Sequence, residues 1–246
     1  AVSLTAGLLS ELTKRKIKVI FCDEKRNPSS ELVSYYGSHD TSAKVRQQVG
    51  WTAEIKKMMW TEIVSEKIRN QQRFLEDLGK KENVMLAEYL KEIQPGDTTN
   101  REGHAAKVYF NAVFGMDFSR SLDIPINAAL NYGYGIILST FNREIVSNGY
   151  ITQLGLFHDN MFNQFNLGSD LMEPFRILVD RKVYKMKPEK FEKEEKLQLV
   201  NILNQEVTID GKRNYVVNAI KIYCKSVFDA INDNDVSLIR FYSNEL

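Results

Sequence analysis

The sequence predicts a mainly α-helical protein that begins with the remnant of a small β domain. A short β-branched and aromatic run lies at residues 17–22, and from about residue 41 almost to the end the apolar residues recur at helical spacing. The chain has no internal repeat, low-complexity tract or Gly/Ser-rich linker. Its 43% hydrophobic and 26% charged residues are the balance of an ordinary globular protein.

The N-terminal piece is predicted to hold one helix and one strand. Leucines at helical spacing favour a helix over residues 3–15, and the β-branched run favours a strand that ends before the turn-forming residues 27–30. One helix and one strand cannot bury their apolar faces alone. We therefore expect this piece to be the end of a β domain whose start precedes residue 1.

The rest of the chain is predicted to be mostly helical, with one hairpin, a loop at residues 96–100, a turn-like stretch at 115–125 and an irregular stretch at 150–168. Asp210-Gly211 favours a hairpin over residues 207–212, and the mixed charges of residues 187–196 indicate a solvated face. Gly133 and Gly135 inside one helix indicate close approach by a neighbouring helix or a ligand, since each costs about 1 kcal/mol relative to alanine. The expected helices cover residues 41–78 (as one very long or two consecutive helices), 85–93, 101–114, 126–148, 170–185 and 215–232.

Charge and cysteine content limit the function classes. The chain has 33 Lys and Arg against 32 Asp and Glu, which excludes a globally basic nucleic-acid binder but permits a local basic face. Cys22 and Cys224 supply no disulfide framework, and no apolar run approaches the roughly 18–20 residues that span a bilayer. We expect a cytoplasmic protein without a membrane segment. The absence of a Gly-rich phosphate loop and of a G-x-S-x-G motif disfavours nucleotide and serine hydrolysis.

A histidine and two nearby acids form a candidate metal site. The three histidines are His39, His104 and His158, and the last is followed by two acids, Asp170 and Glu173, that a helix would place together. On a helix these two carboxylates, three residues apart, share one face. Carboxylate oxygens with one imidazole suit Mg²⁺ or Mn²⁺ better than zinc.

The same acids also fit a purely structural interpretation. Asp170 is a good N-cap and Glu173 completes a capping-box pattern, and Thr99 and Glu102 form T-x-x-E ahead of another apolar helix. Spacing alone favours this capping interpretation. His104 is a poor co-ligand for Glu102, because the two residues point to different sides of a helix.

Basic residues follow the acidic pair along the predicted helix 170–185. Alone they indicate only a solvated surface, but beside a metal cluster they favour a substrate that carries phosphate. Arg176, three residues beyond Glu173, is a candidate phosphate clamp. The candidate DNA-binding residues are Arg176, Arg181 and Lys182.

Four ordered blocks, at residues 101–111, 127–134, 156–158 and 169–176, resemble a known family. They begin with Arg-Glu-Gly-His-Ala-Ala and end with Ser-Asp-Leu-Met-Glu-Pro-Phe-Arg. The likeness is to the CRISPR-associated spacer integrase and endonuclease (the Cas-one adaptation protein), and it is closest to the type II branch. It runs through almost the whole chain, and four ordered blocks are far more specific than any one of them.

This resemblance implies a fold and a metal site. It implies that residues 1–30 end an N-terminal β domain, and that residues 31–246 form an α-helical catalytic domain. The family's metal ligands fall on Glu102, His158 and Glu173, with Asp170 as a possible fourth contributor, so the resemblance favours metal binding over capping. The implied reaction depends on Mg²⁺ or Mn²⁺: the 3′-hydroxyl of a DNA fragment attacks a phosphodiester at the repeat boundary. His158 is either a ligand or a proton donor.

The resemblance also implies partners. These are double-stranded and branched DNA, a second copy of the chain in a homodimer, and the second CRISPR adaptation protein (Cas-two) in a heterohexamer. Type II relatives also work with the effector nuclease and a ring-forming DNA-end protein. The expected location is the cytoplasm of a prokaryote. The alternative function is a non-catalytic DNA-binding scaffold in the same kind of complex.

Overall fold

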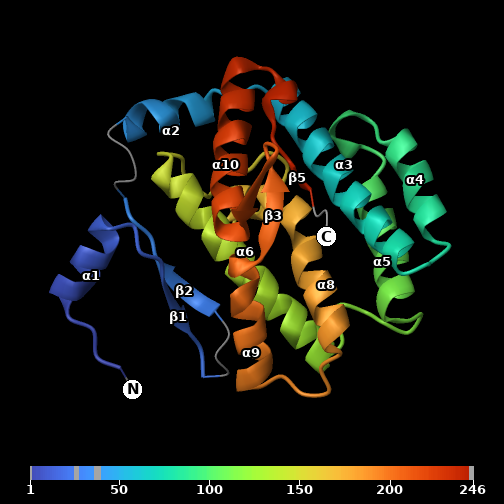
Figure 1. Ribbon diagram of the computed structural model, residues 1–246. Helices are drawn as coiled ribbons and strands as arrows, with labels where there is room; N and C mark the ends of the chain where they lie inside the picture. Colours follow the sequence, from blue (N-terminus) through green and yellow to red (C-terminus); the bar gives the residue numbers. More distant parts are fainter. Residues whose placement is uncertain (1, 25–27, 36–39, 244–246) are drawn as a thin grey trace.

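Three long helices, α3 (Ala53–Asp77), α6 (Pro125–Ser147) and α10 (Val216–Asp233), form the centre of the fold (Figure 1). The computed structural model describes residues 2–24, 28–35 and 40–243, so His39 lies outside the described residues. Apolar residues at helical spacing bury one continuous core between these helices, from Ile63 on α3 through Ile137 on α6 to Ile220 on α10. The prediction of a mainly helical chain is confirmed.

Helices α4 (Asn83–Glu92) and α5 (Arg101–Phe114) pack beside α3 on one flank of the molecule (Figure 1). The predicted 41–78 stretch is two consecutive helices, α2 (Thr41–Val49) and α3. The second begins where the Thr52 side chain accepts a hydrogen bond from the amide of Ile55 at 3.3 Å. The predicted bounds of α5 match the observed ones.

The two glycines of α6 mark close contacts, as predicted. A Cβ added at Gly133 would lie 2.4 Å from Cγ1 of Val179 on α8 (Arg176–Met186), and one at Gly135 would lie 3.2 Å from Cγ of Pro28. The first glycine therefore admits a neighbouring helix, and the second admits the N-terminal hairpin. No ligand is needed to explain either.

The N-terminal piece consists of α1 (Ala6–Lys14), β1 (Val19–Cys22) and β2 (Pro28–Leu32), which pairs antiparallel with β1. The prediction of turn residues at 27–30 was wrong for β2, because a proline is tolerated as the first residue of an edge strand. The predicted division at residue 30 falls within this strand, and the two-domain organisation stays a prediction.

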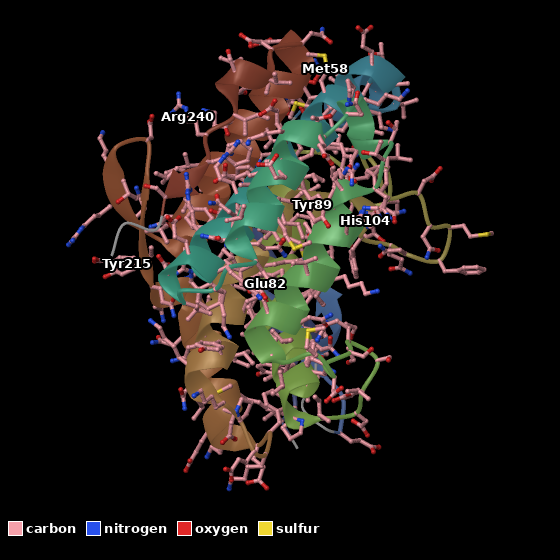
Figure 2. The ribbon with its side chains drawn as sticks, turned by 90° about the vertical axis from the view of Figure 1, so that its right-hand side faces the viewer. Met58, Glu82, Tyr89, His104, Tyr215 and Arg240 are labelled. Carbon is pink, nitrogen blue, oxygen red and sulfur yellow. The ribbon has the colours of Figure 1, made fainter. Side chains whose placement is uncertain are left out.

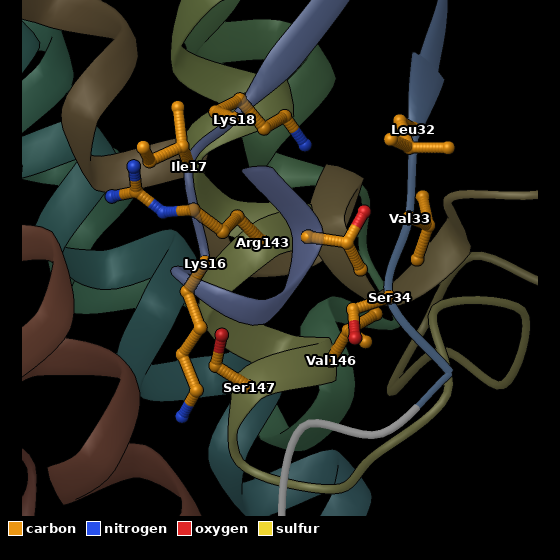
Figure 3. Close-up of a pocket in the computed structure, with 10 residues that line it drawn as sticks. Lys16, Ile17, Lys18, Leu32, Val33, Ser34, Arg143, Val146 and Ser147 are labelled. Carbon is orange, nitrogen blue, oxygen red and sulfur yellow. The ribbon is translucent and has the colours of Figure 1, made fainter. Parts of the chain in front are cut away.

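A pocket lies between the N-terminal piece and α6. Lys18 lines it and forms an ion pair with Glu31, and Arg143 of α6 lines it from the other side (Figure 3).

The segment predicted as one helix over residues 170–185 is three elements: α7 (Asn166–Leu171), the 3-10 turn η2 (Glu173–Phe175) and α8. Pro174 has no amide hydrogen and ends the first helix, but it fits the start of a new turn. The expected solvated face at 187–196 overlaps another helix, α9 (Lys193–Val200).

The predicted hairpin is formed by β3 (Glu206–Ile209) and β4 (Lys212–Tyr215). Its turn places Asp210 and Gly211 at φ values of 55° and 69°, as an Asp-Gly hairpin turn requires. Strand β5 (Tyr242–Ser243) joins on the other side of β3, which gives the order β4-β3-β5. Among the described residues, no helix combines the length and the apolar character that a membrane crossing needs.

Candidate active site

Glu102 lies in the first turn of α5, and residues before the helix hold it there. The Asp97 carboxylate accepts hydrogen bonds from the amides of Arg101 and Glu102 at 2.7 and 2.9 Å, and the Asn100 side chain accepts from Gly103 at 3.3 Å. Asp97 and Asn100 therefore cap this helix, and the capping box proposed for Thr99 and Glu102 is wrong. The Glu102 carboxylate is free to point toward α3, where it contacts Lys67.

Lys67 joins Glu102 to the second predicted glutamate. Its ammonium forms an ion pair with Glu102 and lies 2.5 Å from Oε2 of Glu173. This oxygen of Glu173 is buried against the ammonium. The other oxygen accepts a hydrogen bond from Nε of Arg176 at 2.9 Å. Two carboxylates from distant segments thus converge on one cation.

The charges at this centre are strongly coupled. Burial acts to raise the pKa of Glu173, but the charges of Arg176 and then Lys67 outweigh it and lower that pKa below its usual value. Burial acts to lower the pKa of Lys67, and the carboxylates of Glu173 and Glu102 raise it instead. Both glutamate partners therefore favour a charged lysine, and Glu173 is ionised.

His158 is held by Asp170, a buried carboxylate in α7. Oδ2 of Asp170 accepts hydrogen bonds from the amides of Leu156 and Phe157 at 2.6 and 3.1 Å, and Oδ1 accepts from the His158 amide at 3.2 Å. Nδ1 of the imidazole lies 2.5 Å from Oδ1, and this hydrogen bond raises the pKa of His158. Because Asp170 engages Nδ1, the other ring nitrogen, Nε2, remains available to bind a cation or to donate a proton.

The loop before His158 fits closely around Asp170. A Cβ at Gly155 would lie 2.3 Å from the carbonyl oxygen of His158 and 2.7 Å from Oδ2 of Asp170, so only glycine fits there. Phe157 stacks on Trp60 of α3, with ring centroids 4.4 Å apart, and the imidazole meets the same indole edge-on at 5.7 Å. The histidine is therefore fixed by both a carboxylate and an aromatic wall.

The structure gathers the predicted site residues into two adjacent centres, one around Glu102 and Glu173 and one around His158 and Asp170. The charge of His158 helps to lower the pKa of Glu173, which links the two centres. Across the described ranges, no three His, Cys, Asp or Glu side chains form a group that could hold a metal ion. The three-ligand site stays a prediction.

Two observations nevertheless fit a divalent cation at the two glutamates. Their carboxylates already meet at one positive group, the Lys67 ammonium, and Oε2 of Glu173 is buried facing that group. Both oxygens of Asp170 are engaged, so Asp170 orients His158 and is a poor candidate for a direct ligand. It also lies inside α7, so the prediction that it is an N-cap was wrong.

The predicted DNA-binding residues have different surroundings. Arg176 donates a hydrogen bond to Glu173, and its guanidinium carbon lies 4.7 Å from the ring centroid of Tyr134. Arg181 forms an ion pair with Asp77 at 2.7 Å, and Lys182 is half-exposed on α8. Their role toward DNA stays a prediction.

Sequence reasoning missed Lys67. Its signal was a lysine placed four residues after Ile63, on the apolar face of the predicted helix, where a buried charge needs a partner.

Comparison with known proteins places the chain in a family. A family model described as "CRISPR associated protein Cas1" matches residues 1–210. The chain belongs to the Cas1 family. It is 31% identical, over 96% of its own length and 80% of the relative's, to a protein of Neisseria meningitidis serogroup C (strain 8013) named "CRISPR-associated endonuclease Cas1". A protein of the same kind from Francisella tularensis subsp. novicida is 26% identical over 90% of this chain and 76% of the relative.

Solved structures share the fold of this Cas1 chain. A casposase bound to an integration product aligns with a TM-score of 0.81 and 19% identity, over 95% of this chain and 77% of the other. A CAS1 protein from Thermotoga maritima aligns with a TM-score of 0.76 and 18% identity, over 93% and 83%. A Cas6-RT-Cas1–Cas2 complex aligns with a TM-score of 0.72 and 20% identity, over 96% of this chain and 30% of the other.

Proposed function

We propose that this Cas1 chain is a metal-dependent DNA integrase and endonuclease that inserts new spacers into a CRISPR array. Family membership and a curated relative named an endonuclease support the nuclease part. The observation that carries the proposal is that Glu102 and Glu173 meet at the Lys67 ammonium, beside a histidine held in a fixed orientation. A helix-capping role requires no such convergence.

The reaction is a transesterification. The 3′-hydroxyl of an incoming strand attacks a phosphodiester, a new phosphorus–oxygen bond forms, and the bond to the 3′-oxygen of the cut strand breaks. The hydroxyl loses a proton and the leaving oxygen gains one. Mg²⁺ or Mn²⁺, held by Glu102, Glu173 and His158, would supply the positive charge that stabilises the phosphate and the leaving oxygen.

The protein's own residues prepare this site. Arg176 fixes one oxygen of Glu173, and the other oxygen faces the cation position. Asp170 fixes Nδ1 of His158, so that Nε2 is available as a ligand or as a donor of the proton to the leaving oxygen. Lys67 keeps the two glutamates together when no metal is bound.

We propose the partners that the family implies. A solved complex named for Cas1 and Cas2 supports a Cas2 partner. The proposed assembly is a heterohexamer in which two Cas1 homodimers hold a Cas2 dimer on double-stranded and branched DNA. A type II effector nuclease and a ring-forming adaptation protein are further proposed partners, in the cytoplasm of a prokaryote. The competing function is a DNA-binding scaffold without catalysis.

A disintegration assay on labelled branched DNA tests the proposal. Glu102→Ala and His158→Ala should each abolish strand transfer and leave duplex binding within about twofold of the unmodified protein. The matched controls are Glu88→Ala, an exposed glutamate paired with Lys91, and His104→Ala, a surface histidine beside Tyr89 on the flank formed by α4 and α5 (Figure 2). Full strand transfer in EDTA, or in both site variants, would refute the metal mechanism. Duplex binding without any strand transfer by the unmodified protein would establish the scaffold function instead.

A further inference from the structure

The segment between α6 and α7 carries two adjacent apolar side chains that are almost fully exposed. Met161 is 87% exposed and Phe162 is 85% exposed, whereas the average phenylalanine is largely buried. They follow His158 by three and four residues. The segment stands out from the body of the molecule on the same side as His104 (Figure 2). Two adjacent apolar groups are therefore displayed next to the candidate active site.

Hydrogen bonds within the segment hold this display in place. The Asn166 amide group donates to the carbonyl oxygens of Gln153 and Asn160 at 3.0 and 3.1 Å, and the side chain of Asn160 accepts from the amide of Phe162 at 2.9 Å. Thr152 donates to the carbonyl oxygen of Gln164 at 2.7 Å. The backbone on both sides of the exposed pair is thus tied down, so the exposure is a built feature.

Charge shows which part of a nucleic acid this segment can contact. No lysine or arginine occurs between Arg143 and Arg176, and Asp159 lies two residues before Met161. A segment without cations offers no ion pairs of its own to phosphates. What Met161 and Phe162 offer is a flat apolar face, which suits the faces of bases.

The size of the patch disfavours a protein partner. A phenylalanine buries roughly 150–250 Å², and a standard protein interface buries about 800 Å² on each partner. Two side chains surrounded by asparagines therefore fall well short of a stable protein contact. Their area matches one or two bases, and apolar side chains that enter a base step are a known way of holding distorted DNA.

We propose that Met161 and Phe162 form a stacking site for an unpaired nucleobase at the DNA branch next to His158. This inference rests on the proposed function, because it takes the strand that is cut or joined as the occupant. A base stacked there fixes the path of the strand before its phosphate reaches His158. The half-exposed ring of Phe157, which stacks on Trp60, continues the apolar surface from the core toward this pair.

The test uses branched DNA with 2-aminopurine in the unpaired strand next to the branch. Titration with the full chain in EDTA gives both affinity and stacking, because a stacked 2-aminopurine loses fluorescence. Phe162→Ala should weaken binding of the branched DNA by at least about fivefold and abolish the quenching. Phe162→Trp should retain both, and binding of perfect duplex should change less than twofold. The matched control is Met116→Ala, at a methionine that is 81% exposed elsewhere.

Each outcome decides one question. If the unmodified chain binds branched DNA and Phe162→Ala matches it in affinity and quenching, the stacking site is refuted and the proposed function stands. If Phe162→Ala instead lowers the oligomeric state measured by light scattering, with DNA binding unchanged, the pair is a protein contact and the inference is wrong. If the unmodified chain neither binds nor processes branched DNA, the proposed function itself fails.

Discussion

Replacing Lys67 by methionine should destabilise the metal-free protein and make its stability depend on a divalent cation. Methionine keeps the apolar stem and removes the charge, so Glu102 and Glu173 face each other without the ammonium between them. Removing one partner from a buried ion pair costs about 3–5 kcal/mol. Glu173 keeps Arg176, and the Glu102 side chain is 27% exposed and reaches water, so we expect the lower end of this range.

A loss of about 3 kcal/mol should lower the Tm by about 6–12 °C in a chain of this size. Mn²⁺ at about 100 times its Kd should return about 2.7 kcal/mol, because it binds only the folded site. In the unmodified protein the cation must first displace the Lys67 ammonium, so the same concentration of Mn²⁺ should raise its Tm by less.

Thermal melts with and without Mn²⁺ test this expectation. The matched control is Lys91→Met, because the exposed Lys91–Glu88 pair is worth about 0–1 kcal/mol and lies away from the site. Isothermal calorimetry with Mn²⁺ should show tighter binding to Lys67→Met than to the unmodified chain. A Tm within about 2 °C of the unmodified protein, or equal Mn²⁺ affinity in both, would refute the bridging role of Lys67.

Three further changes have defined outcomes. Asp170→Asn should slow strand transfer by about 10–100-fold with duplex affinity unchanged, since it loosens His158; equal rates would contradict this orienting role. Burial raises the pKa of Asp180 to about 6, so the folded state binds its proton more tightly than the unfolded state does. Stability from this group is complete below the unfolded pKa and is lost as pH rises through about 6; urea unfolding at pH 4.5 and 7.5 should show Asp180→Asn gaining about 2 kcal/mol relative to the unmodified chain between these two pH values. Gly133→Ala should cost about 1–3 kcal/mol by forcing a methyl group against Val179, and an unchanged Tm would show that the two helices separate freely.

The sequence predicted the helices best where apolar residues recur without interruption. The bounds of α5 and the near-match at α10 follow from such runs. Local rules failed where a proline decided the backbone: Pro28 opens a strand, and Pro174 divides the predicted helix 170–185 into three elements. Both prolines sit where only the surrounding structure determines whether they begin or end an element.

The site was predictable only in part. The residues themselves put His158, Asp170 and Glu173 forward as a candidate metal site, although spacing alone favoured caps. Resemblance to a family added Glu102 and favoured metal binding. Lys67 was missed because its partners come from other elements, one of them 35 residues away along the chain. A buried lysine on an apolar helix face signals a partner but does not say which one. That pairing arises from tertiary packing.

Three successive amides, those of residues 156–158, donate to Asp170. Changes in the length of this segment and changes in its side chains should therefore have different effects. An insertion between Gly155 and His158 would pull the imidazole off its carboxylate, since the amides of residues 156–158 all converge there. An altered tip at residues 161 and 162 would leave that anchor in place. Members of this family can therefore vary the tip while they inherit an unchanged histidine geometry. Length should be the constrained quantity before His158, and beyond it the general character of the side chains rather than the exact residue.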